Sequence, residues 1–575
     1  MRSIDNPAVS KQYTAHTAQT TVARFSPSGF YIASGDVTGS VRVWDSIGAE
    51  NTKGEYHIIA GRINDIAWDG DSQRIIAVGD GKERFGHCIT ADSGNSVGEI
   101  SGHASQINCV SIRQQRPLRA ATGSDDTSLV FLHGAPFKFN TSVRGKHDKF
   151  IYGTQFSPDG SALVSVGSDR RIWLYDGKTG EATKQIGEGE HKGSIFGVSW
   201  ASDSKRLATC SGDQTVKVWD VESGQCVQSW RMGGEGVSVP DQQVGVTWPA
   251  GRSDGLIISL DLEGNLNYFH VDKAEGPVKV VRGHQKAITS AASAPGSASL
   301  VTGSYEGRAR SWDLTTGAAD LVDGEMHSNQ VSGLAAGGSG RVYSVGWDDS
   351  LRTADVAQKS FVGGAVKTAG QPKGVAVAAS NGKEFTIVAS TAGLNVYSEG
   401  REVGSLPLPS APTCIAANAS SDLVASGADD KLVRIYKLSS SGSLAELTTL
   451  RDATAPISAL AFSPSGTRLA AGLGNGKVFA YSSSSPESWK LETNRWSAHT
   501  ARVTSLCWSP DGEKAVSGSL DTNVCVWSLA NPGARVKATN AHKEGVGAVV
   551  WVEDGRVVSC GADAAVKVWK VEGVA

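Results

Sequence analysis

The chain has 575 residues, too many for one compact core, so two domains are expected. Its 55 Lys and Arg are interspersed with 58 Asp and Glu, for a net charge of −3, which excludes a polybasic face for nucleic acid or a membrane surface. The start is no signal peptide, no run of 18 apolar residues can span a bilayer, and the eight cysteines form no CxxC pair. We therefore expect a cytoplasmic protein with reduced core thiols, no membrane insertion and no metal site.

A unit of about 44 residues recurs along the chain, and the best copies close with a strand such as Val-Lys-Val-Trp-Asp. In chain order the closing strands are Val41–Asp45, Gly86–Thr90 (badly eroded), Leu129–His133, Ile172–Asp176, Val216–Asp220, Leu266–His270, Ala309–Asp313, Leu351–Asp355, Leu394–Ser398, Val433–Lys437, Val478–Ser482, Val524–Ser528 and Val566–Lys570. This period, with a Trp near the end of the third strand, predicts the WD-repeat blade of an all-β propeller. Propellers present surfaces to partners far more often than they perform chemistry.

The unit from His191 to Asp220 shows how a blade is built. Apolar and polar residues alternate over Ile195–Trp200, Arg206–Cys210 and Thr215–Asp220, which predicts three half-buried strands joined by tight turns. In such blades an Asp, a His, a Ser or Thr and the Trp form a buried hydrogen-bonded set. Because buried polar groups must be paired, the set recurs or erodes as a unit.

The same positions in other units extend this predicted structural network. Its clearest members are His191, Asp213, Trp219, Asp169, Asp521, Trp527, Asp563 and Trp569, with further turn acids at Asp126, Asp348 and Asp430 and further histidines at His16, His103, His147, His284, His327, His499 and His542. A Ser-His-Asp hydrolase needs one such set at one cleft, so the recurrence favours a structural role. We expect no catalytic residue, no cofactor and no enzyme activity.

Thirteen closing strands fall one short of two seven-bladed rings. Ala8–Tyr13 is predicted to be the outer strand of a first blade whose inner strands are missing. Only six residues follow Trp569, so the last blade has no outer strand of its own, and its ring needs a strand from elsewhere. Pro277–Val281 could supply that strand or could finish the preceding blade.

We expect two tandem propellers, nominally seven-bladed each. The first covers residues 1–282 and has an incomplete first blade, and the second covers residues 283–575. A boundary one blade later, near Asp323–Ser328, is the alternative. Gly472–Lys477 lacks the spacing of a phosphate loop and is expected to be a turn, and Ser439–Ser443 and Ser482–Ser485 are expected to be loops between strands.

Several segments do not follow from a generic WD repeat, and they carry a resemblance to a known family. These segments are Ile63–Trp68, Val78–His87, Asp92–Gly102, Gln115–Pro117, Gly123–Asp126, Gly134–Phe139, Asp241–Val244 and Ser517–Thr522. Together they resemble the actin-interacting protein 1 family, over a range from about Ile4 to the C-terminus. The resemblance implies a monomeric cofactor of ADF/cofilin that binds and disassembles actin filaments, by fragmentation, barbed-end capping or both, at cortical actin structures. Family members usually carry an N-terminal stretch that supplies the blade missing here.

Candidate partner-binding residues remain once the blade consensus is subtracted. Asp125 is a surplus acid beside the structural Asp126, and Glu83 lies in a charged loop of an eroded blade. Phe137, Lys138 and Phe139 follow Gly-Ala-Pro between strands, where paired aromatics have no obvious core to enter. The resemblance places acids and aromatics at such positions in the cofilin–actin surface. The alternatives are a solvated loop for Glu83, a second turn ligand for Asp125 and packing between blades for Phe139.

Two other classes of function are the alternatives. A generic WD-repeat scaffold, such as a ubiquitin-ligase adaptor, would have the same blades without the distinctive segments. An enzyme would need a single unrepeated polar cluster near a channel, and the sequence offers none.

Overall fold

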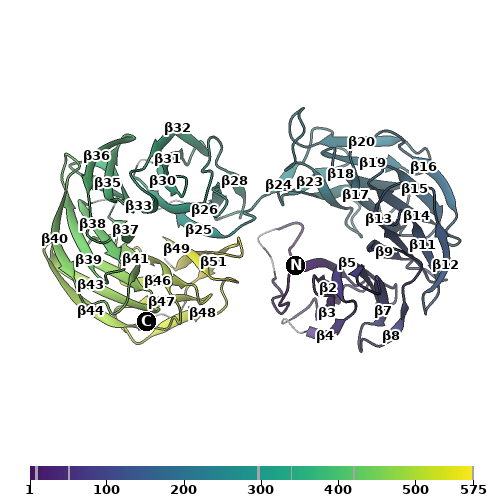
Figure 1. Cartoon of the computed structure of the whole chain (residues 1–575), viewed down its shortest axis with the longest axis horizontal. Helices are drawn as coiled ribbons and strands as arrows, with labels where there is room; N and C mark the ends of the chain where they lie inside the picture. Colours follow the sequence, from purple (N-terminus) through teal and green to yellow (C-terminus); the bar gives the residue numbers. More distant parts are fainter. Residues whose placement is uncertain are drawn as a thin grey trace. The chain divides into compact units, whose positions relative to one another are not determined.

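A computed structural model gives the fold and describes residues 1–6, 9, 11–48, 52–293, 298–338, 340–418, 421–553 and 555–572. The chain divides into two compact units, Met1–Val281 and Arg282–Ala575. All regular structure in the described ranges is β-strand, and the sheets of each unit follow one another around a ring (Figure 1). No described segment forms a helix that could cross a bilayer.

The described part of the first unit holds six four-stranded antiparallel sheets, each built from consecutive strands. Their strands are β1 (Thr20–Phe25), β2 (Tyr31–Asp36), β3 (Ser40–Asp45), β4 (Thr52–His57); β5 (Gly61–Trp68), β6 (Arg74–Gly81), β7 (Gly86–Thr90), β8 (Ser96–Glu99); β9 (Ile107–Ile112), β10 (Arg119–Ser124), β11 (Leu129–His133), β12 (Lys138–Val143); β13 (Ile151–Phe156), β14 (Ala162–Gly167), β15 (Ile172–Asp176), β16 (Ala182–Ile186); β17 (Ile195–Trp200), β18 (Arg206–Ser211), β19 (Thr215–Asp220), β20 (Cys226–Arg231); and β21 (Gln243–Thr247), β22 (Leu256–Asp261), β23 (Leu266–His270), β24 (Lys279–Val281).

The second unit holds, within its described residues, six four-stranded sheets and one three-stranded sheet. Their strands are β25 (Ile288–Ala292), β26 (Ser299–Ser304), β27 (Ala309–Asp313), β28 (Ala319–Leu321); β29 (Val331–Ala336), β30 (Arg341–Gly346), β31 (Ser350–Asp355), β32 (Ser360–Lys367); β33 (Pro372–Ser380), β34 (Lys383–Ser390), β35 (Gly393–Ser398), β36 (Arg401–Leu406); β37 (Pro412–Ala417), β38 (Leu423–Ala428), β39 (Val433–Leu438), β40 (Leu444–Leu450); β41 (Ile457–Phe462), β42 (Arg468–Leu473), β43 (Lys477–Ser485), β44 (Ser488–Ser497); β45 (Val503–Trp508), β46 (Lys514–Ser519), β47 (Val524–Ser528), β48 (Arg535–Ala538); and β49 (Val546–Glu553), β50 (Arg556–Gly561), β51 (Val566–Lys570).

Each sheet is one blade, and the predicted all-β, WD-repeat architecture is confirmed. All thirteen predicted closing strands are present as the third strands of the blades. The serine run Ser482–Ser485 is an exception to the loop predictions, because it extends β43 and pairs with the start of β44.

The hydrophobic core lies between neighbouring blades. One cluster joins Val164 and Leu174 of one blade to Leu207 and Trp219 of the next, and each of these side chains is buried. Because both faces of a blade are covered in this way, the second and third strands read as nearly continuous apolar runs. A blade at the end of a row therefore exposes apolar residues unless another blade covers it.

The second unit closes on itself. Ile288 and Leu300 of the β25–β28 blade pack against Ala548 and Val558 of the β49–β51 blade, in one buried cluster. The three-stranded blade thus completes the ring through its inner strands, without a fourth strand among the described residues.

The first unit differs at its two end blades. Phe25 ends the inner strand β1 and is exposed, whereas the matching Trp68 is buried and donates a hydrogen bond to the preceding blade. Leu260 in β22 is also exposed, whereas the matching Cys210 is buried. Both side chains occupy faces that another blade covers elsewhere in the fold.

Two strand predictions for these regions have clear outcomes. β24 pairs with β23, so Pro277–Val281 contributes the strand that finishes its own blade. Within Ala8–Tyr13, Ala8 and Ser10 lie outside the described residues, and the described positions carry no strand, so the predicted outer strand is wrong there. Instead, the hydroxyl of Tyr13 donates to the carbonyl of Asp45 at 2.8 Å.

Candidate partner-binding surface

The repeated Asp, His and Trp residues form buried polar sets within single blades. His191 Nδ1 lies 2.9 Å from Asp213 Oδ2, and its Nε2 lies 2.8 Å from the hydroxyl of Thr209. The indole of Trp219 donates to the same hydroxyl at 2.8 Å. Burial alone would raise the pKa of the Asp213 carboxyl, but hydrogen bonds from His191 and Thr215 hold that pKa below its usual range.

Equivalent sets occur in blades of both units. They are His16–Asp36–Ser34–Trp44, His103–Asp126–Thr122, His147–Asp169–Ser165–Tyr175, His327–Asp348–Ser344, His499–Asp521–Ser517–Trp527 and His542–Asp563–Ser559–Trp569. Two predicted members of the network differ. Asp430 pairs with Arg434 at 2.6 Å, and His284 bonds the hydroxyl of Thr302 in a blade whose turn has no Asp at the equivalent position. The same kind of set recurs in blades of both units, so no single set is distinguished by its residues.

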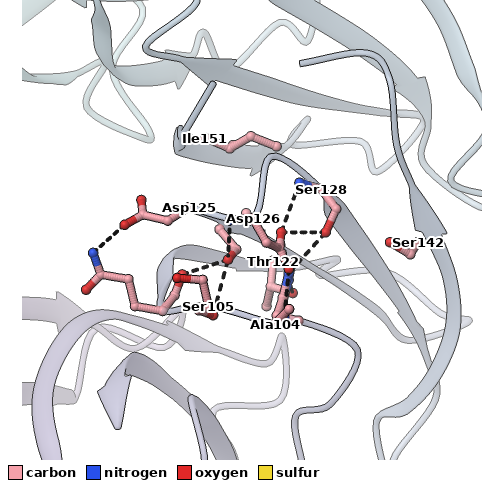
Figure 2. A network of polar contacts seen from close by, with 12 residues as sticks. Ala104, Ser105, Thr122, Asp125, Asp126, Ser128, Ser142 and Ile151 are labelled. Carbon is pink, nitrogen blue, oxygen red and sulfur yellow. Dashed lines mark hydrogen bonds and ion pairs between the residues drawn. The ribbon is translucent and has the colours of Figure 1, made fainter. Parts of the chain in front are cut away.

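The turn between β10 and β11 carries two neighbouring acids with different roles. Asp126 bonds His103 and the hydroxyl of Ser128, as the structural acid of its blade. Asp125 extends to the other side of the turn, away from that set (Figure 2). There the amide of Gln106 donates to one carboxylate oxygen at 2.5 Å and the amide of Asn108 to the other at 2.7 Å.

Asp125 is therefore half-buried and held in one orientation. The expectation of a free surplus acid is wrong, because both carboxylate oxygens are engaged by amides that β9 and its preceding residue supply. What remains is a fixed negative charge at the turn, oriented before any partner arrives.

Glu83 lies in the corresponding turn of the preceding blade, between β6 and β7. Its side chain is exposed, and so are those of the flanking Lys82 and Arg84. β5 and β6 each have eight residues, and their pairing continues to Arg62 and Asp80, next to the turn. Because these strands are longer than β9 and β10, the turn of Glu83 projects farther from its blade than the turn of Asp125 does. Both acids lie at the same end of adjacent blades, because both occupy the turn between the second and third strands.

Phe137, Lys138 and Phe139, which the sequence also predicts for the partner-binding surface, differ in their burial. Phe137 is 1% exposed and packs in the core between the β5–β8 and β9–β12 blades, so the expectation that it has no core to enter is wrong. Lys138 and Phe139 are exposed and begin the outer strand β12. The ring of Phe139, 49% exposed, lies against Gly102, where an added Cβ would approach it to 2.6 Å.

The structure separates these residues from the acids. Lys138 pairs with His133 at the end of β11, whereas Asp125 precedes the start of that strand. Phe139 thus covers the seam between two blades on the outer edge. This partly matches the alternative that Phe139 packs between blades. The exposed half of its ring is accessible to a partner.

One exposed aromatic residue, adjacent in the sequence to Ile151, was missed from the sequence. Phe150 immediately precedes β13 and is 45% exposed, and its ring meets that of Tyr152 edge to face, with 6.4 Å between centroids. The amide of Asn108, which holds Asp125, also donates to the carbonyl of Ile151 at 3.0 Å. Comparing the residue before the inner strand from unit to unit is the signal that could have found Phe150.

The described residues contain no group of three or more His, Cys, Asp or Glu placed to hold a metal ion. All eight cysteines are free thiols. Burial raises the pKa of the Cys88 thiol to about 12, so it stays protonated near neutral pH. The chemistry that this surface offers is fixed charge and exposed aromatic area.

Comparison with known proteins identifies the repeat and the family. The family model described as "WD domain, G-beta repeat" matches residues 8–45, 94–131, 138–176, 184–220, 275–313, 400–437, 445–482, 490–528 and 533–570. Actin-interacting protein 1 of Drosophila melanogaster is 38% identical over 100% of this chain and 92% of its own length, and that of Caenorhabditis elegans is 35% identical over 97% and 91%. The chain belongs to the actin-interacting protein 1 family. WD repeat-containing protein 1 of Gallus gallus, 37% identical over 99% of this chain and 93% of its own length, is a similar relative.

The matched repeats of this member of the actin-interacting protein 1 family leave a gap between residues 45 and 94. That gap contains the strands β5, β6 and β7 of one blade, with the extended, charged turn at Glu83. The candidate surface is thus partly built from a blade that departs from the general repeat, and such departures carry specificity better than the shared framework does.

Proposed function

We propose that this protein binds actin filaments and works with ADF/cofilin to disassemble them, by fragmentation, barbed-end capping or both. The observation that carries the proposal is near full-length similarity to proteins named actin-interacting protein 1 in two animals. The protein would then act as a monomer of 59.9 kDa in the cytoplasm, at cortical actin structures. It would bind its partners without a cofactor and without catalysing a reaction.

The first unit is the proposed site of this interaction. Glu83 and Asp125 lie at one end of adjacent blades, and Phe150 follows on the next blade beside the amide that orients Asp125. The fixed acid Asp125, the exposed acid Glu83 and an exposed aromatic ring on neighbouring blades suit a basic, partly apolar protein surface. Lys138 and Phe139 form a second contact on the outer edge of the β9–β12 blade.

Disassembly by such a protein rests on differential binding. A partner that favours a distorted, cofilin-decorated filament over an undistorted one shifts the equilibrium by that difference in binding free energy alone. Several weak contacts on adjacent blades of one unit can engage actin and ADF/cofilin together and add up to useful avidity. The rigidity of the blades keeps those contacts in register.

A sedimentation assay tests the proposal directly. Purified protein is mixed with actin filaments, with and without ADF/cofilin, and the actin that remains in the supernatant after high-speed centrifugation is measured. We expect more non-sedimenting actin with both proteins than with ADF/cofilin alone. No increase over ADF/cofilin alone would overturn the function.

Variants of the surface locate the site. Glu83→Lys, Asp125→Lys, Phe139→Ala and Phe150→Ala should each reduce cofilin-dependent disassembly while leaving the melting temperature near that of the wild type. Glu222→Lys is the matched control, since Glu222 is exposed in the turn between β19 and β20, at the other end of a different blade. Full activity in all four surface variants would overturn the site and leave the function standing.

A further inference from the structure

One turn position in the second unit carries apolar residues in four consecutive blades. It is the first residue after the second strand, and we call these four residues, Leu520, Ala562, Tyr305 and Trp347, the apolar arc. Their blades are β45–β48, β49–β51, β25–β28 and β29–β32, which follow one another because the ring closes between β49 and β25. Each backbone N–H donates to the residue just before its blade's inner strand: Leu520 to Arg502, Ala562 to Gly545, Tyr305 to Ala287 and Trp347 to Gln330. The four side chains therefore start from the same end of their blades.

The arc is exposed, and the fold does not require it to be apolar. Tyr305 and Leu520 are each 52% exposed and Trp347 is 40% exposed. Tyr305 and Trp347 are the exposed aromatic side chains in the described part of the second unit. Elsewhere in the ring this position is Thr391, Asp429 or Gly474. Isolated exposed apolar residues are ordinary, but a row of them at one position in adjacent blades is typical of an interaction site.

Cations are interleaved with the arc. Lys373 Nζ lies 5.8 Å from the centroid of the Trp347 ring, within the range of a cation–π contact. Lys286 precedes Ala287, whose carbonyl accepts the N–H of Tyr305, and the carbonyl of Arg502 itself accepts the N–H of Leu520. Both cations are exposed, and among the described residues neither has an ion-pair partner. Asp349 and Glu544 are the exposed acids nearby in the sequence.

Most acids that directly follow the arc residues are engaged inside their own blades. Asp348, Asp521 and Asp563 are held by the histidines of their own blades and stay within the structural sets. Glu306, which follows Tyr305, is half-buried and interacts electrostatically with the buried Arg310. Aromatic anchors beside unpaired cations favour a partner that brings an apolar side chain together with carboxylates.

We propose that the apolar arc binds an extended acidic peptide segment of another protein. Its apolar or aromatic anchor lies at Tyr305 and Trp347, and its carboxylates face Lys286, Lys373 and Arg502. An extended segment suits this site because the arc is a line of turn residues on successive blades rather than one deep cavity. This binding site lies in the second unit and does not depend on the proposed function of the first.

A peptide selection tests the proposal with the full-length protein. A phage-displayed library of random dodecapeptides is selected on the wild type and counter-selected on the double variant Tyr305→Ala/Trp347→Ala. We expect enriched sequences with several Asp or Glu and at least one large apolar residue. The assay contains neither actin nor ADF/cofilin, so its outcome is separate from that of the sedimentation assay.

The most enriched peptide is then synthesised with a fluorescein label and titrated by fluorescence anisotropy. Tyr305→Ala, Trp347→Ala and Arg502→Glu should each weaken binding at least tenfold. Val403→Ala is the matched control and should not, since Val403 is an exposed apolar residue on the outer strand β36 of the same unit. The proposal is overturned if no sequence is enriched, if enriched sequences are basic or lack a charge bias, or if Val403→Ala weakens binding as much as the arc variants do.

Discussion

Asn108 and Asp125 are joined by a hydrogen bond of 2.7 Å, from the side-chain amide of the first to a carboxylate oxygen of the second. The same amide nitrogen donates to the carbonyl of Ile151 in the next blade at 3.0 Å. Asn108 is the second residue of its inner strand, and in five other blades this position holds a hydroxyl that contacts a carbonyl of the next blade and a carbonyl of its own blade, but no turn acid. The contacts to the next blade are Thr21 to Ile63, Thr289 to Val331, Thr413 to Ile457, Ser458 to Val503 and Thr504 to Val546. Asn108 thus serves the ring and the candidate surface together.

The substitution Asn108→Thr should separate those two roles. A threonine can keep the bond to the carbonyl of Ile151, as Thr413 and Thr504 do in their blades, but its side chain is too short to reach Asp125 as well. We expect a melting temperature within a few degrees of the wild type, and a reduced supernatant fraction of actin in the sedimentation assay. Asn108→Ala loses both contacts and should cost about 1 to 3 kcal/mol of stability in addition.

If Asn108→Thr were as active as the wild type, the orientation of Asp125 would not be needed for disassembly. Gln106→Ala is an independent check, since Gln106 holds the other carboxylate oxygen of Asp125. It should reduce activity in the same direction as Asn108→Thr.

The Asp–His–Trp sets should contribute stability rather than activity. Asp213→Ala leaves Nδ1 of His191 and the hydroxyl of Thr215 without their carboxylate partner in a largely buried site. We expect a loss of about 1 to 3 kcal/mol in the free energy of unfolding, measured by chemical denaturation, with cofilin-dependent disassembly nearly intact. Glu222→Ala removes an exposed acid from the turn between β19 and β20 of the same blade and serves as the control. Unchanged stability with complete loss of activity in Asp213→Ala would show that the structural assignment is wrong.

The blade framework could be predicted from the sequence because its signals are local. Trp219, Asp213 and the alternation of Thr215–Asp220 lie within a few residues of one another, and together they locate the third strand and its turn. The burial of Phe137 depends on residues distant in the sequence, since its core includes side chains such as Ile76 and Val78 from the preceding blade.

The orientation of Asp125 is hidden from the sequence for the same reason. Its two amide partners precede it by 19 and 17 residues, just before and on a strand that any blade would have. A polar residue on such a strand has no pattern that tells whether it binds the next blade, a turn or solvent. Phe150 can be found from the sequence only by comparing the residue before the inner strand across all units, and its exposure is known only from the structure.

The stability of the second unit should depend on pH through His284. Burial lowers the pKa of this imidazole to about 3 from 6.5, with Arg310 as a second cause. Its folded pKa is depressed, so the unfolded chain binds the proton more readily and stability falls as the pH drops from about 6.5 towards 3. The slope contributed by one such group is at most about 1.4 kcal/mol per pH unit.

This slope can be measured by thermal unfolding between pH 7.5 and pH 5, values chosen to bracket the ordinary pKa of histidine at about 6.5. His284→Gln keeps a polar side chain next to Thr302 but cannot take up a proton. The variant should lose less of its melting temperature over this interval than the wild type loses. Equal pH dependence of the two proteins would show that His284 does not contribute.

The second unit should fold when it is produced alone. Its ring is closed by buried contacts between the first and last blades, such as Ile288 against Ala548, and these contacts need no residue of the first unit. We expect residues 283–575 to give a soluble monomer that unfolds in one cooperative transition in a denaturant titration followed by tryptophan fluorescence. Ala548→Asp places a charge in the seam where the ring closes and should lower the denaturation midpoint sharply, whereas Val403→Asp on the exposed outer strand β36 should not. A fragment that aggregates or unfolds without cooperativity would contradict the independence of this unit, and equal effects of the two aspartates would contradict the role given to the seam.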